Sequence, residues 1–404
     1  MSGFEETVER GKTVTISEAD GDLILEGCTV IPSGVKVVVH GTLVVRGRST
    51  VKGSLKAEEV RGSGDLLVEG GLEASDVRLD NGASLDVKGD FRADDVDVPN
   101  SIRVGGRTEV SDMRVGGTAV LTGDAKVEDA KVGGTLEARA KLESDEVRVG
   151  GTLQVKVLIS CDVRVGGNLR AGTIKAEDVD VGGTVEVSGG VNIGNLTVGG
   201  TAAVGGGEVE DVRVGGILRS VGELVFEEIR VGGQLTIGSG KGEKVSIGGI
   251  LEVATDMKLE DKLSVGGNAM IGGALEAGSI GVGGNLEAAK AVADDRLEIG
   301  GMLSTSAGSR AREVDISRGA RVRGPIVGET VRIKENAEVE DVYADSLWAE
   351  ANCSLRNIYV RRAEVGRGCK VSGRLEYTEA LHLGKDITLA NQPEKVPGLP
   401  NPPI

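Results

Sequence analysis

The stretch Val149-Gly150-Gly151-Thr152-Leu153 decides the fold, because versions of it return throughout the middle of the chain. After a shorter first step from Val104 to Val115, the copies follow one another every 16 to 18 positions or so, and such a fixed period indicates a fold built by stacking one structural unit. Each copy opens with Val or Ile before a Gly-Gly pair, and the opening residues are Val104, Val115, Val132, Val149, Val165, Val181, Val198, Val214, Val231, Ile247, Val265, Val282 and Ile299.

The length of the unit narrows the choice of fold. Helical repeats need about 33 to 47 residues and leucine-rich repeats about 20 to 29. The shorter unit of this chain has room for three short strands and three corners, which is one winding of a β-solenoid. We therefore predict an all-β fold, a single-stranded parallel β-helix of triangular cross-section with about 16–18 residues per winding. Roughly 22 windings at about 4.8 Å each would make a rod on the order of 100 Å long.

Apolar alternation within one winding predicts the core. Six small or medium side chains point inward in each turn, and in one winding they are Val163, Val165, Leu169, Ala171, Ile174 and Ala176. We expect the Gly-Gly pair at a sharp corner for two reasons. Glycine adopts positive φ without a steric penalty, and it leaves room for the winding stacked on it.

Composition supports a narrow core and limits the partners. Only 2% of the 404 residues are aromatic, while 65 are glycine, and a thin tube has room mainly for Val, Ile, Leu and Ala. The formal net charge of -16 disfavours nucleic acid and acidic membrane surfaces as main partners. Cys28, Cys161, Cys353 and Cys369 have no metal-ligand spacing, so we expect small apolar fillers.

The chain divides into five segments by its pattern. We predict a flexible arm over residues 1–12, irregular windings over 13–100 and regular windings over 101–305. Windings with Gly-Ala or Asn-Ala corners follow over 306–390, and a proline-rich tail over 391–404 is expected to be disordered. The N-terminus has no basic region followed by an apolar run, and no stretch has the composition of a membrane span, so we expect a cytoplasmic location.

Two columns of charge are predicted on the outside of one face. An acidic residue recurs three positions before the opening Val, and a basic residue recurs one position before it. Stacking would place like charges about 4.8 Å apart, so the adjacent opposite column must offset their repulsion. This candidate charged face comprises Asp129, Glu146, Arg148, Asp162, Arg164, Asp211, Arg213 and Arg230.

The segment 306–390 carries a family resemblance. Ile316-Ser317-Arg318-Gly319-Ala320-Arg321-Val322, then Val331 to Val339 with Asn336-Ala337, then Val365-Gly366-Arg367-Gly368-Cys369-Lys370-Val371 resembles the bactofilin family of polymer-forming cytoskeletal proteins. The likeness is looser over 20–305. It implies a right-handed triangular β-helix that joins end to end into filaments without a nucleotide. The chain departs from the family in its greater length and in lacking a phenylalanine in its last windings.

The sequence offers little catalytic chemistry. His40 and His382 are its only histidines and are predicted to lie far apart along the solenoid, which excludes a multi-histidine metal site within one chain. Residues 238–243 contain Gly-Ser-Gly-Lys but lack the spacing and the helix of a phosphate loop. We therefore expect no enzyme activity, no cofactor and no metal.

The two open ends of the predicted solenoid remain as functional candidates. Each end would expose strand N–H and C=O groups and a section of apolar core, which must be paired or capped. We predict end-to-end self-association into a filament, a scaffold or at least a dimer, and leave open attachment of other proteins or a membrane through the termini. The alternative is a binding rod that recognises a protein or a polysaccharide through the charged face. The candidate interface residues are Val14, Ile16, Leu23, Leu25, Leu381, Leu383, Ile387 and Leu389.

Overall fold

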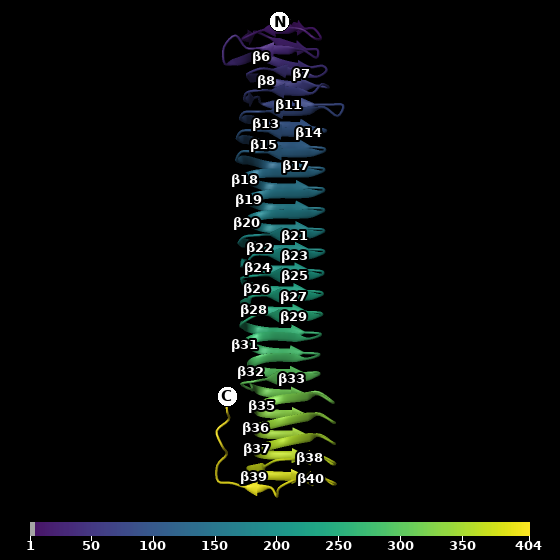
Figure 1. Ribbon diagram of the computed structural model, residues 1–404, viewed down its shortest axis with the longest axis vertical. Helices are drawn as coiled ribbons and strands as arrows, with labels where there is room; N and C mark the ends of the chain where they lie inside the picture. The colour runs from purple at the N-terminus through teal and green to yellow at the C-terminus, as the bar shows by residue number, and fades with distance from the viewer. Residues whose placement is uncertain (1–4) are drawn as a thin grey trace. The chain divides into compact units, whose positions relative to one another are not determined.

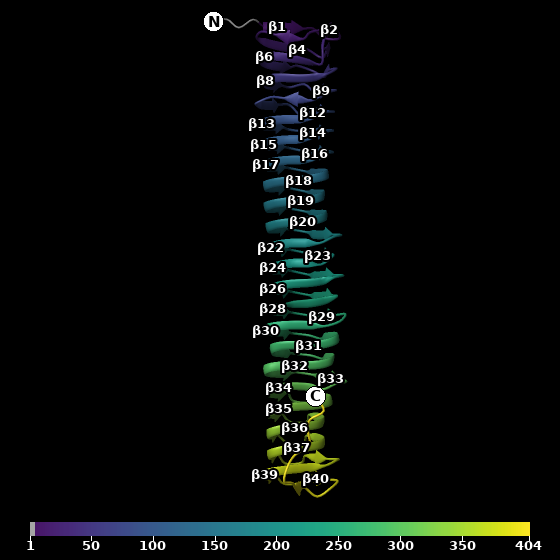
Figure 2. The ribbon, with the colours of Figure 1, turned by 90° about the vertical axis from the view of Figure 1, so that its left-hand side faces the viewer.

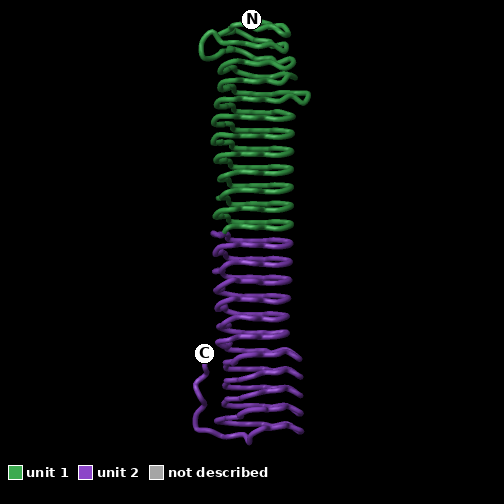
Figure 3. The backbone as a smooth tube through the Cα atoms, in the orientation of Figure 1, with its two compact units in different colours: residues 1–205 green, residues 206–404 purple. Residues whose placement is uncertain are grey.

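The computed structural model describes residues 5–404, which fold into parallel β-solenoid windings of about 17 residues each, about 23 in all. The described residues contain no helix. They form two compact units, which lie within the ranges Met1–Gly205 and Gly206–Ile404 (Figure 3). The predicted fold class is confirmed.

Unit 1 consists of short strands that follow one another around successive windings. Its strands are β1 (Glu5–Val8), β2 (Thr13–Thr15), β3 (Glu18–Ala19), β4 (Asp22–Leu25), β5 (Thr29–Ile31), β6 (Lys36–Val45), β7 (Ser49–Val51), β8 (Ser54–Gly62), β9 (Leu66–Val68), β10 (Leu72–Glu73), β11 (Asp76–Leu79), β12 (Ser84–Val87), β13 (Phe91–Val98), β14 (Ser101–Val104), β15 (Thr108–Val115), β16 (Thr118–Leu121), β17 (Ala125–Val132), β18 (Thr135–Val149), β19 (Thr152–Val165), β20 (Asn168–Val181), β21 (Thr184–Val187), β22 (Val191–Val198) and β23 (Thr201–Val204).

Unit 2 repeats the same arrangement. Its strands are β24 (Gly207–Val214), β25 (Ile217–Ser220), β26 (Glu223–Val231), β27 (Gln234–Ile237), β28 (Ser239–Ile247), β29 (Ile250–Val253), β30 (Met257–Val265), β31 (Ala269–Val282), β32 (Leu286–Ile299), β33 (Met302–Thr305), β34 (Ser309–Ile316), β35 (Arg321–Ile333), β36 (Glu338–Ala349), β37 (Ser354–Val365), β38 (Lys370–Val371), β39 (Leu375–Leu383), β40 (Thr388–Leu389) and β41 (Glu394–Lys395).

Within each unit, a strand pairs in parallel with the equivalent strand of the next winding (Figures 1 and 2). In unit 1, Val149 is in register with Val132 on one side and Val165 on the other. The predicted inward residues of that region are buried: Val163, Val165, Leu169, Ala171, Ile174 and Ala176 are each at most 7% exposed. The core is therefore a narrow column of aliphatic side chains inside the windings.

The short first step in the repeat has a structural cause. Val104 is in register with Val87 and Leu121, whereas Val115 is in register with Val98 and Val132. Gly105-Gly106 and Gly116-Gly117 therefore lie at two different corners of the winding. The prediction treated all Gly-Gly copies as one column, but the copy at Val104 belongs to a different column from those that begin at Val115.

The explanation expected for the Gly-Gly corners is half wrong. Gly150 and Gly151 are not among the residues with positive φ. A Cβ on Gly150 would instead lie closer than 3.0 Å to the carbonyl oxygen of Gly133, in the corner below. Glycine is required because stacked corners leave no room for a side chain, not because the backbone is left-handed.

The windings over 306–390 keep the register of those before them. Ile299 pairs with Ile316, and Ile316 pairs with Ile333. The corners themselves differ, because Gly319, Asn336, Asn352 and Gly368 have φ of 67°, 61°, 59° and 70°. The buried residue after each is small: Ala320, Ala337, Cys353 or Cys369. Cys28 is also buried, so the filler prediction is confirmed for three cysteines and wrong for the exposed Cys161.

Both predicted terminal segments are more ordered than we expected. Residues 5–8 of the arm form β1, which pairs with β4, while residues 1–4 lie outside the described part of the chain. In the predicted disordered tail, β41 pairs with β39, and the backbone N–H of Val396 donates to the oxygen of Tyr377 at 2.9 Å. Backbone pairing, which does not depend on side-chain pattern, orders both segments.

Candidate functional site

The last winding of unit 2 exposes an apolar edge. β39 pairs with β37 through Ala363↔Leu381 and Val365↔Leu383, and β40 pairs with β38. Among the described residues, β40 has no partner on its other side, and β41 covers β39 only at Glu376 and Tyr377. Leu383 is 41% exposed, and Leu381, Ile387 and Leu389 are half-buried. The structure brings these four predicted residues together at one edge, which we call the C-terminal edge.

The first windings of unit 1 differ from the prediction. Leu23 and Leu25 are 1% and 0% exposed, because β1 lies over β4 and pairs Glu6 with Leu23 and Val8 with Leu25. These two residues are therefore core residues, and their assignment to the interface was wrong. Val14 and Ile16 are half-exposed. Among residues 5–404, β2, which contains Val14, pairs with β5 alone.

The two charged columns exist in both units. In unit 1, Asp129, Glu146 and Asp162 are in register, as are Lys131, Arg148 and Arg164. In unit 2, Asp211 is in register with Glu228, and Arg213 with Arg230. The candidate charged-face residues therefore line up along each unit as the period predicted.

Each cation of these columns already has a carboxylate partner. Arg164 contacts Asp162 at 2.6 Å and Glu146 at 3.0 Å, and Arg148 also pairs with Glu146. Lys131 and Asp129 are 3.4 Å apart, Arg230 and Glu228 2.6 Å, and Arg213 and Asp211 3.8 Å. These partly exposed pairs contribute only about 0 to 1 kcal/mol each to stability. Much of the charge on this face is compensated internally.

A groove of about 850 Å³ follows the basic column of unit 1. Gly-Gly corners such as Gly133 and Gly150 line it beside the cations, and Asp97 and Asp180 lie among its lining residues. In the column, Asp97 precedes Arg114 and Asp180 follows Arg164, so the basic stretch is bounded by acidic residues. The sequence predicted the columns, but the groove depends on the absence of side chains at the corners.

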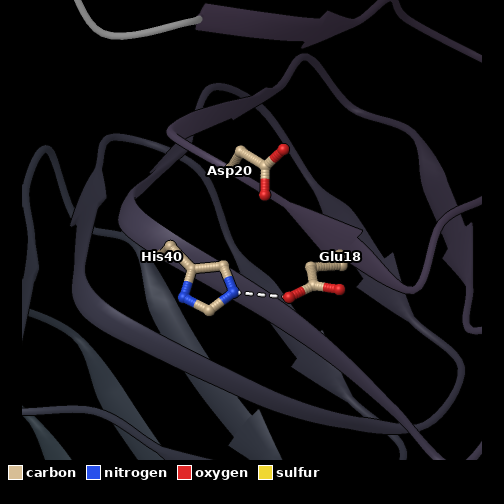
Figure 4. A group of neighbouring side chains, drawn as sticks. All are labelled: Glu18, Asp20 and His40. Atoms are coloured by element: carbon tan, nitrogen blue, oxygen red, sulfur yellow. Dashed lines mark hydrogen bonds and ion pairs between the residues drawn. The ribbon is translucent and has the colours of Figure 1, made fainter.

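One group of possible metal ligands was missed. Glu18, Asp20 and His40 place their ligand atoms within 4.8 Å of one another, and His40 Nε2 lies 2.6 Å from Glu18 Oε1 (Figure 4). It is the one such group among residues 5–404, and all three side chains are exposed. The pairing of β3 with β6 brings them together across an irregular winding. This irregular spacing hid the group from an argument based on period.

An aromatic cluster was also missed. Tyr343 and Tyr359 are in register in consecutive windings of unit 2, whereas the third tyrosine, Tyr377, is in register with the core residue Val360 and lies outside the cluster. The rings of Tyr343 and Tyr359 stack with centroids 4.8 Å apart. Burial raises the pKa of Tyr343, and the neighbouring Tyr359 adds to the effect. These two tyrosines lie about one winding apart in the sequence, and this spacing was a signal that could have revealed the cluster.

Comparison with known proteins adds no evidence beyond the fold itself. No family model, no curated protein and no solved structure matches the chain. Residues 5–404 include no helix that could span a membrane.

Proposed function

We propose that this chain is a structural protein that self-associates through the ends of its solenoid into filaments or a scaffold, without a nucleotide or other cofactor. The observation that carries the proposal is the C-terminal edge, where strands with unpaired edges and half-exposed leucines lie together. An open edge of this kind can pair with another strand. We expect the protein to act in the cytoplasm with copies of itself as its main partner.

The resemblance of residues 306–390 to bactofilins supports the same function. The motif residues Gly319-Ala320, Asn336-Ala337 and Gly368-Cys369 are the corners of the windings that lead to this edge. Membership of that family is part of the proposal. It rests on these motifs and on the solenoid fold.

Physical chemistry favours burial of the C-terminal edge. Full burial of an exposed leucine or isoleucine contributes about 1.5–3 kcal/mol, and a joined strand also satisfies the edge N–H and C=O groups. The contact area of one winding is small, so backbone pairing must accompany the apolar contact. The two-residue strand β41 already covers part of β39, so a joining chain meets mainly Leu381, Leu383 and β40.

Two full-length variants at this edge test the proposal. Leu383→Glu and Ile387→Asp place a charge in a surface that loses its water when two copies associate. Because burying an unpaired charge is unfavourable, both variants are expected to weaken association at least tenfold. Sedimentation velocity over a concentration series, with electron microscopy, measures the effect. Val221→Glu is the matched control, because Val221 is 90% exposed and away from the edge.

A binding rod that uses the charged face predicts the reverse sensitivity. The groove of unit 1 is the observation in its favour, and the internal ion pairs weigh against it. Neutralising Arg148 and Arg164 with glutamine should leave self-association unchanged under our proposal. Wild-type protein that stays monomeric at all concentrations would contradict end-to-end assembly and favour the alternative.

A further inference from the structure

One outer face of the last windings carries a mostly apolar column, with the charged residues Arg312, Glu329 and Asp345 beside it. Successive windings place Val292, Arg310, Val327, Tyr343 and Tyr359 in register on it. All of these except the exposed Arg310 are half-buried, although they point away from the core. We call this face the tyrosine face.

The segment 396–404 lies against this face. After β41, the chain runs back along the windings of unit 2 instead of continuing the solenoid (Figures 1 and 2). Leu399, Pro400 and Pro402 line a groove of about 620 Å³ together with Tyr343 and Tyr359. The tail thus forms one wall of a groove whose other wall is the tyrosine face.

The far end of the segment is held by specific contacts. Arg310 Nη2 donates a hydrogen bond of 2.7 Å to the carbonyl oxygen of Ile404. A Cβ on Gly308 would lie 2.5 Å from Cδ1 of Ile404, so a side chain at Gly308 would require the Ile404 side chain to shift. Ile404 therefore lies against Gly308 and Arg310.

The composition of the tail favours polyproline II after β41, because proline fixes φ near the polyproline II value. Residues 396–404 contain Pro397, Pro400, Pro402 and Pro403, and their half-buried side chains are those of Val396, Leu399 and Ile404. Polyproline II has about three residues per turn and no internal hydrogen bonds, so one of its faces can lie on a surface. Aromatic-lined grooves bind such segments because little conformational entropy is lost.

We propose that the tyrosine face is a docking site for extended proline-rich segments, and that the tail of a second copy of this chain occupies it in trans. None of residues 391–404 is fully buried, so the tail can leave its own groove without opening the core. The same contacts then form between two copies, as in domain swapping. The covalent link favours the contact within one chain, and a high local concentration favours exchange.

A peptide experiment tests docking on the full chain. Leu399→Asp with Ile404→Asp releases the tail of the chain, and a labelled peptide of residues 391–404 is then titrated by fluorescence anisotropy. We expect saturable binding, which Tyr343→Ala with Tyr359→Ala weakens about tenfold. Trp348→Ala is the control, because Trp348 is 44% exposed and does not line the groove. Absence of binding, or binding that ignores the tyrosines, overturns the docking site.

A mixing experiment tests the trans arrangement. One chain carries Tyr343→Ala with Tyr359→Ala, the other carries Leu399→Asp with Ile404→Asp, and both carry Leu383→Glu to suppress end-to-end contacts. The first keeps a working tail and the second a working groove, so a heterodimer is expected by light scattering in the mixture and in neither sample alone. A mixture that stays monomeric overturns tail exchange, whatever the outcome for the C-terminal edge.

Discussion

Equivalent strands of this protein end in two kinds of corner, which turn the backbone in different ways. In the regular windings, only Gly150 and Gly151 lie between β18 and β19. In the last windings, the four residues 334–337 lie between β35 and β36. The first kind is short and crowded by the corner below it, and the second is longer and contains one residue with positive φ.

The difference shows what each corner depends on. A two-residue corner depends on its neighbours, because the carbonyl oxygen of Gly133 occupies the space that a side chain on Gly150 would need. A four-residue corner depends on its own backbone, and a small buried residue such as Ala337 fills the space inside it. Substitutions should therefore fail for steric reasons in the first kind and for conformational reasons in the second.

The largest effect is expected at a two-residue corner. Gly150→Ala places Cβ against backbone that cannot rotate away, so we expect a loss of stability on the order of 3 kcal/mol. Gly150→Asn should be no better, because the obstacle is Cβ itself. Guanidinium unfolding followed by circular dichroism, with hydrogen exchange at β18 and β19, measures the loss.

Gly281→Ala provides the matched comparison within a strand. The nearest atom to its added Cβ is the oxygen of Leu263 at 3.9 Å, and Gly281 is not among the residues with positive φ. We expect a change below about 0.5 kcal/mol. Equal losses at Gly150 and Gly281 would show that crowding does not explain the Gly-Gly corners.

A smaller effect is expected at a four-residue corner. Gly319 has φ of 67°, and its added Cβ would meet nothing within 4 Å. Gly319→Ala should cost about 1 kcal/mol from backbone strain alone, and Gly319→Asn should recover much of it because asparagine tolerates this conformation. Thermal unfolding of the two variants compares them directly. If alanine and asparagine cost the same here, the conformational explanation is wrong.

Period and alternation were enough to predict the solenoid, its winding length and inward residues such as Leu169 and Ile174. They could not predict which corner a Gly-Gly pair occupies, because Val104 and Val115 have the same local sequence and different registers. They also placed Leu23 at an open end, because nothing in the pattern of residues 5–8 marks β1. The C-terminal edge was predictable since it continues the pattern, whereas the tyrosine face depends on where the tail lies.

The filling of the four-residue corners is expected to have a small effect at pH 7 and a larger one only above pH 9. Cys353 and Cys369 occupy equivalent buried positions in consecutive windings, and burial raises the pKa of Cys353 from 9.0 to about 11. Because the thiol is harder to ionise in the folded protein, the free energy of unfolding is at its full value below pH 9. It decreases as pH rises from 9 to about 11, where the unfolded chain ionises first. Cys353→Ala loses the contact of Sγ with the oxygen of Lys334, but Ala337 fills the same position one winding earlier, so the loss at pH 7 should be below about 1 kcal/mol. Above pH 9 the variant should lose less stability than wild type. Urea unfolding at pH 7 and at a pH between 9 and 11 measures the difference, with Cys161→Ala as the control because Cys161 is exposed. An unchanged pH dependence in Cys353→Ala would mean that its thiol is not shielded in the corner.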